Sequence, residues 1–260
     1  MRVLFTLLLL LVSSPGSTAP KAELWPYWQQ SNEANTATID HTRWQRTLDN
    51  YLIQQPQQTL FRYRAVSDKD KWELDRYIRS LTTIDPRRYH QDEQFAYWVN
   101  LYNALTVQLI LDNYPLKSIT KLGGFFTFGP WDEELITING QPLSLNDIEH
   151  RILRPIWQDA RIHYVVNCAS LGCPDLQPQA FTASNSEDLL EQAADRFVNS
   201  TKGVKLTGNK VRLSSIYDWY GVDFGNKTAL QSHLNQYWKG DPVQLNSVSY
   251  DYDWTLNETE

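Results

Sequence analysis

The chain has 260 residues and a formal net charge of −6 at pH 7. Its basic residues are interspersed with acidic ones and form no block, which argues against nucleic acid and anionic membrane surfaces as partners. This length is sufficient for one large domain or two small ones.

The N-terminal segment has the pattern of a secretory signal peptide. Arg2 precedes an apolar run from Leu4 to Val12, which is too short to span a bilayer, and small residues follow up to Ala19. We therefore expect a signal peptide over residues 1–19 and a mature chain in the periplasm or outside the cell, with no membrane contact after cleavage. An uncleaved N-terminal anchor is the alternative.

The first half of the chain is predicted to be helical. Residues 20–40 are polar and irregular, which indicates a flexible lead-in, and residues 41–260 are expected to form a single α+β domain. Ser67 and Asp70 form a capping-box pattern before a helix that ends at Asp85.

The longest predicted helix follows, from Gln91 to Tyr114. It is apolar on nearly all sides, which is typical of a buried helix. Asn100 and Asn103 lie in its middle, and a buried amide without a partner costs on the order of 2–7 kcal/mol. These two side chains either tie the helix to loop backbone or line a polar pocket, together with Glu93.

The second half mixes strands and helices. Asn139-Gly140 and Gly208-Asn209 each predict a hairpin. Ser144 and Asp147 predict the start of a short helix that Pro155 breaks, and Ser184 predicts another helix start. Residues 161–167 alternate and are rich in β-branched side chains, which predicts a strand. We therefore expect a helical N-terminal part packed on a small, mostly antiparallel sheet.

The only two cysteines in the sequence, Cys168 and Cys173, follow the predicted strand directly. In this arrangement His163 points inward from the strand, and Asn167 lies at its end. A thiolate is the reactive form of cysteine, and a nearby histidine can act as base and then as acid. We predict Cys168 as the nucleophile, Cys173 as second choice, His163 as base and acid, and Asn167 as a supporting residue.

The same residues allow other interpretations. Two cysteines in an exported protein can form a structural disulfide, which would make this a non-catalytic binding or scaffold domain. They can also be a thiol-redox pair that cycles or captures a small thiol, or two buried inert thiols. Zinc bound by His163, Cys168, Cys173 and His150 is a weaker alternative, because the spacing matches no familiar finger or ribbon.

A substrate of the Cys-His site would be a small molecule or a peptide, held by Asn100, Asn103 and Glu93. His150 and Arg154, one helical turn apart, can in addition grip a carboxylate. No cofactor and no metal is predicted. The activity of such a site would be acyl transfer or amide hydrolysis.

Several motifs resemble a known family. They are "FAYWVNLYNALTVQLIL", "YPLKSI", "LSLNDIEHRILR", "RIHYVVNCASLGCPDL" and "YDWTLN", in this order between residues 93 and 257. The set is similar to the domain of unknown function 547 family, whose bacterial members are often exported. The family's characteristic positions fall here on Trp98, Asn100, Asn103, His150, Arg154, His163, Asn167, Cys168, Ser170, Cys173, Pro174, Tyr252, Asp253, Trp254 and Asn257.

A second likeness concerns the fold. A buried helix followed by strands, one of them bearing a histidine, resembles the core of papain-like and transglutaminase-like folds. In those folds the nucleophilic cysteine begins the helix. No cysteine lies near Glu93 or Tyr97 here, so a related site would take its thiol from the loop of residues 168–173.

Overall fold

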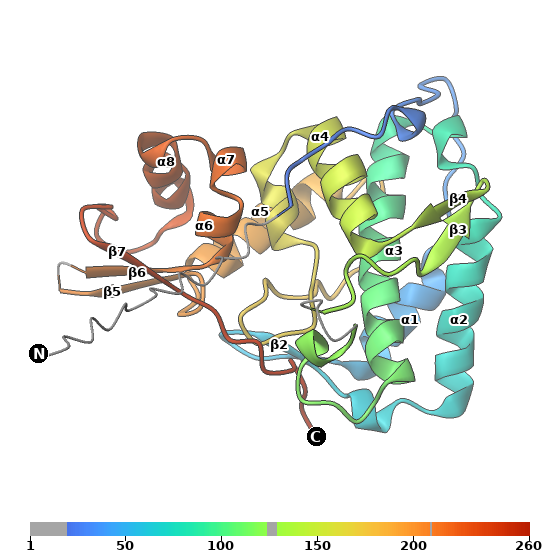
Figure 1. Ribbon diagram of the computed structural model, residues 1–260, viewed down its shortest axis with the longest axis horizontal. Coiled ribbons are helices and arrows are strands. Elements are labelled where there is room, and N and C mark those ends of the chain that lie inside the picture. The colour runs from blue at the N-terminus through green and yellow to red at the C-terminus, as the bar shows by residue number, and fades with distance from the viewer. Residues whose placement is uncertain (1–19, 124–128, 209) are drawn as a thin grey trace, which may run out of the picture.

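The computed structural model describes residues 20–123, 129–208 and 210–260 (Figure 1). The predicted signal peptide, residues 1–19, lies outside the described residues. No helix within the described ranges has both the length and the apolar character needed to cross a membrane.

Helices and short strands alternate along the chain. The helices are α1 (Thr42–Tyr51), α2 (Asp68–Thr82), α3 (Gln91–Asp112), α4 (Arg154–Trp157), α5 (Ser186–Val198), α6 (Ile216–Trp219), α7 (Gly221–Phe224) and α8 (Lys227–Tyr237). The strands are β1 (Leu52–Gln54), β2 (Thr59–Phe61), β3 (Ile136–Ile138), β4 (Gln141–Leu143), β5 (Val204–Thr207), β6 (Lys210–Ser214) and β7 (Val248–Asp251). β1–β2, β3–β4 and β5–β6 are antiparallel, whereas β6–β7 is parallel. The predicted α+β class with small, mostly antiparallel sheets is confirmed.

The helix α3 lies between α1 and α2 on one side and α5 to α8 on the other (Figure 1). Its residues are buried on every side from Glu93 to Val107, as expected from a sequence without a polar face. Trp98 packs edge-on against Trp28 and Tyr97, with ring centroids 5.1 and 4.9 Å apart. The helix therefore forms the core on which the functional loops rest.

Two local signals in the sequence are confirmed. Ser67 Oγ accepts a hydrogen bond from Asp70 N at 3.1 Å and begins α2. The β3–β4 hairpin turns at Asn139 and Gly140, whose φ values of 51° and 73° suit a type I′ turn. The second predicted hairpin connects β5 and β6, although Asn209 itself lies outside the described residues.

The predicted strand over residues 161–167 is wrong. Residues Ala160–Tyr164 form a 3-10 helix, which begins where Asp159 accepts a hydrogen bond from Arg161 N at 2.8 Å. Every residue from 162 to 167 is buried, so the alternation in sequence does not correspond to one buried and one exposed face. The segment packs between α3 and α5, and no strand among the described residues pairs with it.

The helix after Ser144 begins as predicted but does not break at Pro155. Asp147 N donates to Ser144 Oγ at 3.1 Å, and Ser144 N donates to the Asp147 carboxylate at 2.9 Å. Asp147–Leu153 is a π-helical segment in which Arg154 N donates to Glu149 O, and α4 continues from it. Pro155 is the second residue of α4, and its missing N–H removes one backbone hydrogen bond without ending the helix.

The predicted helix start at Ser184 is displaced. The helix α5 begins at Ser186, whose Oγ donates to Thr182 O at 2.7 Å, and its N-cap residue Asn185 makes no capping hydrogen bond with the helix. The Asn185 side chain instead accepts from Thr182 N at 2.8 Å and so shapes the turn before the helix.

The segment of residues 20–40, expected to be a flexible lead-in, is attached to the domain. Trp28 is buried in the core, and Ile39 N donates to Glu93 Oε1 at 2.6 Å. Glu23 N donates to His150 O at 2.9 Å, beside the π-helical segment. The segment has little regular structure, yet its side chains and backbone both contact the core.

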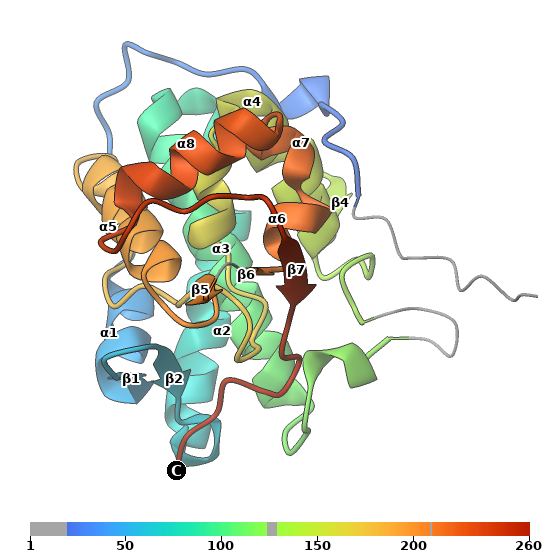
Figure 2. The same cartoon turned by 90° about the vertical axis from the view of Figure 1, so that its left-hand side faces the viewer.

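The C-terminal segment crosses the molecule after β7. Figure 2 shows it running from β7 down to the β1–β2 hairpin, which the sequence analysis missed. There Phe61 N donates to Asn257 O at 2.8 Å, and Thr259 N donates to Phe61 O at 3.1 Å. On its way the segment contacts the loop that carries both cysteines.

Candidate functional site

The loop from Asn167 to Pro174 carries both cysteines and is closed by a side-chain amide. Asn167 Oδ1 accepts a hydrogen bond from Ala169 N at 2.9 Å, and its Nδ2 donates to Pro174 O at 2.8 Å. Ala169 has a φ of 56°, in the left-handed region that a residue with a β-carbon rarely adopts. The amide of Asn167 therefore supports a backbone turn that alanine disfavours.

The helix α3 holds the start of this loop. Asn103 Nδ2 donates to Val165 O, and its Oδ1 accepts from Asn167 N, both at 2.8 Å. One turn earlier, Asn100 makes the same pair of contacts with the backbone of Phe181, at 2.8 and 2.9 Å. Both amides thus tie α3 to loop backbone, which was one of the two alternatives. Substrate binding by either residue stays a prediction.

The C-terminal segment pairs with the other side of the loop. Leu171 N donates to Thr255 O, and Gly172 N donates to Asp253 O, both at 2.8 Å. A β-carbon added at Gly172 would lie 2.7 Å from Asp253 N, so this close approach requires glycine. The pairing brings Tyr252 onto the two thiols.

Both cysteines are free thiols, and they are in contact with each other. The two Sγ atoms lie 2.8 Å apart, and Cys168 N donates to Cys173 Sγ at 2.8 Å. Tyr252 Oη lies 2.9 Å from Cys168 Sγ, and Ser170 Oγ lies 3.4 Å from it. Cys173 is 2 % exposed, whereas Cys168 is partly exposed. One thiol is therefore accessible and the other lies behind it.

The surroundings separate the acidities of the two thiols. Burial opposes ionisation of Cys168, but hydrogen bonds from Cys173, Ser170 and Tyr252 outweigh it and hold the pKa of Cys168 below its usual value. Burial, and then the hydrogen bond to Cys168, raises the pKa of Cys173 well above the usual value. Burial also raises the pKa of Tyr252, so its hydroxyl stays protonated and remains a donor. The arrangement favours a Cys168 thiolate beside a Cys173 thiol.

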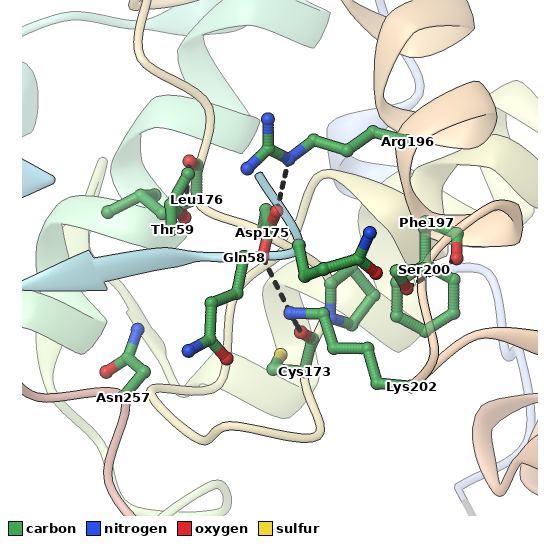
Figure 3. A network of polar contacts seen from close by, with 12 residues as sticks. Gln58, Thr59, Cys173, Asp175, Leu176, Arg196, Phe197, Ser200, Lys202 and Asn257 are labelled. Carbon is green, nitrogen blue, oxygen red and sulfur yellow. Dashed lines mark hydrogen bonds and ion pairs between the residues drawn. The ribbon is translucent and has the colours of Figure 1, made fainter. Parts of the chain in front are cut away.

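A second set of polar contacts holds the far end of the loop (Figure 3). Lys202 Nζ donates to Cys173 O and to Asp175 Oδ1, both at 2.6 Å. Asp175 also forms an ion pair with Arg196, and its own side chain is almost fully buried. The buried carboxylate therefore has two cationic partners, and this network fixes the backbone of the buried cysteine relative to α5.

His163 belongs to a different cluster, which we call the charged cluster: Glu149, His150, Arg154, His163 and Asp223. Asp223 on α7 contacts His163 Nε2 at 2.7 Å and Arg154 Nε at 2.6 Å. His150 Nδ1 lies 2.9 Å from Arg154 Nη1, and Glu149 lies 3.4 Å from His163 Nδ1. Four of the five residues lie on the π-helical segment, on α4 or on the 3-10 helix beside them.

The charged cluster is buried but its charges are compensated. Burial opposes ionisation of Glu149, but His150, His163 and Arg154 lower the pKa of Glu149 to about 2. Burial also opposes ionisation of Asp223, while His163 and Arg154 hold its pKa well below the usual value. Burial lowers the pKa of His150 to about 4. The cluster therefore keeps both of its carboxylates ionised at neutral pH although Glu149 is buried.

The predicted site residues thus fall into separate groups. Cys168, Cys173 and Asn167 lie together in one loop. His163 lies with His150 and Arg154 in the charged cluster. No hydrogen bond or ion pair in the described part of the chain joins His163 to a cysteine.

Glu93 lies with neither group and accepts a hydrogen bond from Ile39 N. Across residues 20–123, 129–208 and 210–260, no three His, Cys, Asp or Glu side chains are arranged to hold a metal ion.

Two polar pockets lie beside the loop. One, of about 390 Å³, is bordered by Asp175, Arg196 and Ser200, and the other, of about 270 Å³, by Gly172, Lys202 and Tyr252. Gln57 borders both. The pockets therefore lie on the two sides of the Lys202–Asp175 ion pair.

Reasoning from the residues missed several members of these groups. Tyr252 and Ser170 entered only through the family resemblance, while Asp175, Lys202 and Asp223 were not identified. Lys202 and Asp223 lie far from their partners in sequence, and no local pattern marks them. Asp175 directly follows Cys173-Pro174, so its proximity to the cysteine was the one available signal.

Comparison with protein families identifies a match, whereas comparison with individual proteins does not. No curated protein and no solved structure matches the chain. Residues 86–198 match the family model described as protein of unknown function, DUF547. The matched segment contains α3, the π-helical segment, both cysteines, His163 and α5, while Tyr252 lies beyond it. Residues 86–198 of the chain therefore form a DUF547-family segment.

Proposed function

We propose that this protein is a thiol–disulfide exchange protein, in which Cys168 is the attacking thiol and Cys173 the resolving thiol. The contact of the two Sγ atoms at 2.8 Å carries the proposal. A disulfide has an S–S length of about 2.05 Å, so the two sulfur atoms need to approach by less than about 1 Å to form a bond. The accessible, more acidic thiol lies outside the buried, less acidic one, as an attacking and a resolving thiol require.

The reaction with a substrate disulfide has two steps. Cys168 thiolate attacks one substrate sulfur, a bond forms between that sulfur and Cys168 Sγ, and the other substrate sulfur leaves as a thiolate that takes a proton from solvent. Cys173 then attacks Cys168 Sγ, and the second substrate sulfur leaves with the Cys173 proton. The substrate disulfide is reduced by two electrons to two thiols, and Cys168–Cys173 becomes a disulfide. The reverse sequence oxidises a substrate dithiol.

Three contacts support the assigned roles. Tyr252 and Ser170 can donate hydrogen bonds to a Cys168 thiolate, and bonds to a charged acceptor are stronger than neutral ones. Cys168 N donates to Cys173 Sγ and can stabilise that sulfur when it becomes negative. The Asn167 turn and Lys202 fix the two ends of the loop, so the sulfur atoms stay aligned.

A Cys-His acyl transferase or amide hydrolase has less support. In that mechanism the histidine must reach the thiol or a bound substrate, directly or through one water. The contacts of His163 are with Asp223, Glu149 and the ring of Tyr220, which stacks on it at 4.1 Å. An exported location, in the periplasm or outside the cell, remains part of the proposal, because oxidising compartments maintain disulfides.

Redox titration of the full chain tests the proposal. The protein is equilibrated in mixtures of reduced and oxidised dithiothreitol, trapped with an alkylating reagent and analysed by peptide mass. We expect a reversible two-electron transition between the dithiol and a Cys168–Cys173 disulfide, and faster alkylation of Cys168 than of Cys173 at low pH. With Cys173→Ser, incubation with a peptide disulfide should accumulate a mixed disulfide at Cys168.

An unactivated thiol serves as the control. Ala183 lies exposed in the turn before α5, so Ala183→Cys in a chain with Cys168→Ser and Cys173→Ser presents one ordinary surface cysteine. Cys168 in the Cys173→Ser variant should exchange faster than this reference at pH 6. Equal rates, or a Cys168–Cys173 bridge that opens only on denaturation, would leave a binding or scaffold domain with a structural disulfide as the function.

A further inference from the structure

The two pockets beside the thiol loop border each other. Gln57 lines both of them, and the consecutive residues Ser200, Thr201 and Lys202 pass from one pocket to the other. Asp175 and Arg196 border the larger pocket, and Lys202, which pairs with the same Asp175 carboxylate, borders the smaller one (Figure 3). The pockets therefore form two halves of one polar depression, of about 390 and 270 Å³, which we call the double pocket.

The charges along the double pocket compensate each other. Lys202 and Arg196 both pair with Asp175. On the outer rims, Lys239 pairs with Asp195 and Arg212 with Asp251, each at 2.7 Å. Because every one of these cations already has a carboxylate partner, the surface does not favour a polyanion such as a nucleic acid or a phosphorylated ligand.

The remaining polar groups are mainly side-chain amides. Gln54 and Gln192 line the larger pocket and make no side-chain hydrogen bond within the described residues. Gln57 Oε1 accepts a hydrogen bond from Thr201 N at 3.3 Å, and its Nε2 amide protons remain for a ligand. Gln177 donates to Asp175 O and keeps its Oε1 as an acceptor. Such groups offer both donors and acceptors to a neutral polar ligand.

A polypeptide backbone is the ligand that matches this chemistry. Each residue of an extended chain presents one N–H and one C=O, and neighbouring residues advance by about 3.3–3.6 Å. Tyr252 borders the smaller pocket, and its Oη atom lies 2.9 Å from Cys168 Sγ. A saccharide fits less well, because Tyr252 is the one aromatic side chain that borders either pocket.

We propose that the double pocket binds an extended polypeptide segment and presents a cysteine or disulfide of that segment to Cys168. The substrate class is then a protein or peptide, not a small thiol, and this assignment rests on the proposed exchange function. Asp175, Lys202 and Arg196 form the rigid wall of the groove, while the glutamine side chains bind the peptide backbone.

Paired variants and paired substrates test the assignment. Gln54→Ala combined with Gln192→Ala removes the two amides without described partners and leaves the thiol loop untouched. With a peptide disulfide we expect KM to rise roughly tenfold at nearly constant kcat, a change in the range that single polar contacts produce. With bis(2-hydroxyethyl) disulfide, which is too small to reach these residues, the kinetic constants should not change. The matched control is Gln30→Ala with Gln236→Ala, two exposed glutamines outside both pockets.

A binding experiment separates failure of the groove from failure of the exchange function. The Cys168→Ser, Cys173→Ser chain is titrated with a cysteine-free, unstructured peptide of about ten residues, which spans about 33–36 Å when extended. Binding that weakens with the Gln54 and Gln192 substitutions supports the groove even if no exchange activity is found. An unchanged KM for the peptide disulfide in the Gln54→Ala, Gln192→Ala variant, or binding of a neutral oligosaccharide in place of the peptide, would overturn the proposal.

Discussion

The hydroxyl of Tyr252 lies 2.9 Å from the Sγ atom of Cys168, and this contact joins residues 84 positions apart in the chain. The C-terminal segment places the hydroxyl there through two backbone hydrogen bonds to Leu171 and Gly172. The polar surroundings of Cys168 therefore include a residue that is far from it in sequence.

Removal of this hydroxyl should slow the thiol. With Tyr252→Phe, the Cys168 thiolate loses a donor, and a hydrogen bond to a charged group contributes about 1.5–3 kcal/mol. We expect alkylation of Cys168 by iodoacetamide at pH 6 to be at least roughly tenfold slower. Tyr250→Phe is the matched control, because that side chain is on the same segment and is exposed. Similar rates in both variants would show that Tyr252 does not set the acidity of Cys168.

Replacement of Asn103 by alanine should destabilise the fold. The substitution leaves Val165 O and Asn167 N buried without partners, and each such group costs about 1–3 kcal/mol. Urea denaturation should show a loss of about 2–5 kcal/mol in the free energy of unfolding. The control Asn50→Ala changes an exposed asparagine and should stay within about 0.5 kcal/mol of the parent. A small change in the free energy of unfolding of Asn103→Ala would instead mean that the fold does not require this amide, which could then bind a ligand.

Stability should fall as the pH is lowered from neutral. Burial lowers the pKa of both His41 and His150 from 6.5 to about 4, so between these values the unfolded chain binds more protons than the folded chain. The pKa of Glu149 falls from 4.5 to about 2, and its contribution is present above pH 4.5 and lost between pH 4.5 and 2. Each proton contributes up to about 1.4 kcal/mol per pH unit.

His150→Gln isolates one of these protons. Denaturation midpoints measured from pH 7 to pH 4 should show a shallower pH dependence for this variant, with the contributions of His41 and His233 retained. Gln236→Ala, which changes an exposed side chain outside the charged cluster, should follow the parent. Parallel curves for His150→Gln and the parent would mean that the ring of His150 is protonated in the folded state.

Gly172→Ala should separate the thiol loop from the C-terminal segment. The new β-carbon would lie 2.7 Å from Asp253 N and 3.0 Å from Asp253 O, so backbone atoms must move. We expect a loss of about 1–3 kcal/mol in stability together with slower alkylation of Cys168. Gly221→Ala, where a β-carbon meets nothing within 4 Å, should be neutral or slightly stabilising. Unchanged alkylation of Cys168 in Gly172→Ala would show that the C-terminal segment does not affect the reactivity of this thiol.

Local signals in the sequence predicted local structure well. The continuous apolar run of α3, the Ser67 cap and the Asn139-Gly140 turn each depend on residues within a few positions of one another, and each is confirmed. The segment of residues 161–167 was predicted wrongly because its β-branched residues are buried on all sides, so their order reflects packing against α3 and α5 and not a strand face.

The site was harder to predict than the fold. The loop with Asn167, Cys168 and Cys173 could be identified, because its polar residues stand close together in sequence. The partner of His163 could not, because Asp223 lies 60 positions away in a short helix without a distinctive motif. A spacing argument placed His163 beside the thiols, whereas the structure gives it a carboxylate partner in the charged cluster.

The pairing of Leu171 with Thr255 has a consequence for biosynthesis. A ribosome delivers the chain from its N-terminus at about 5–20 residues per second, so the cysteines emerge well before the segment that contacts them. Until residues 252–257 arrive, the loop lacks the Tyr252 hydroxyl and the backbone partners of Leu171 and Gly172. The surroundings of the two thiols are therefore complete only after residues 252–257 have been synthesised, and a chain truncated before Tyr252 carries both cysteines without these contacts.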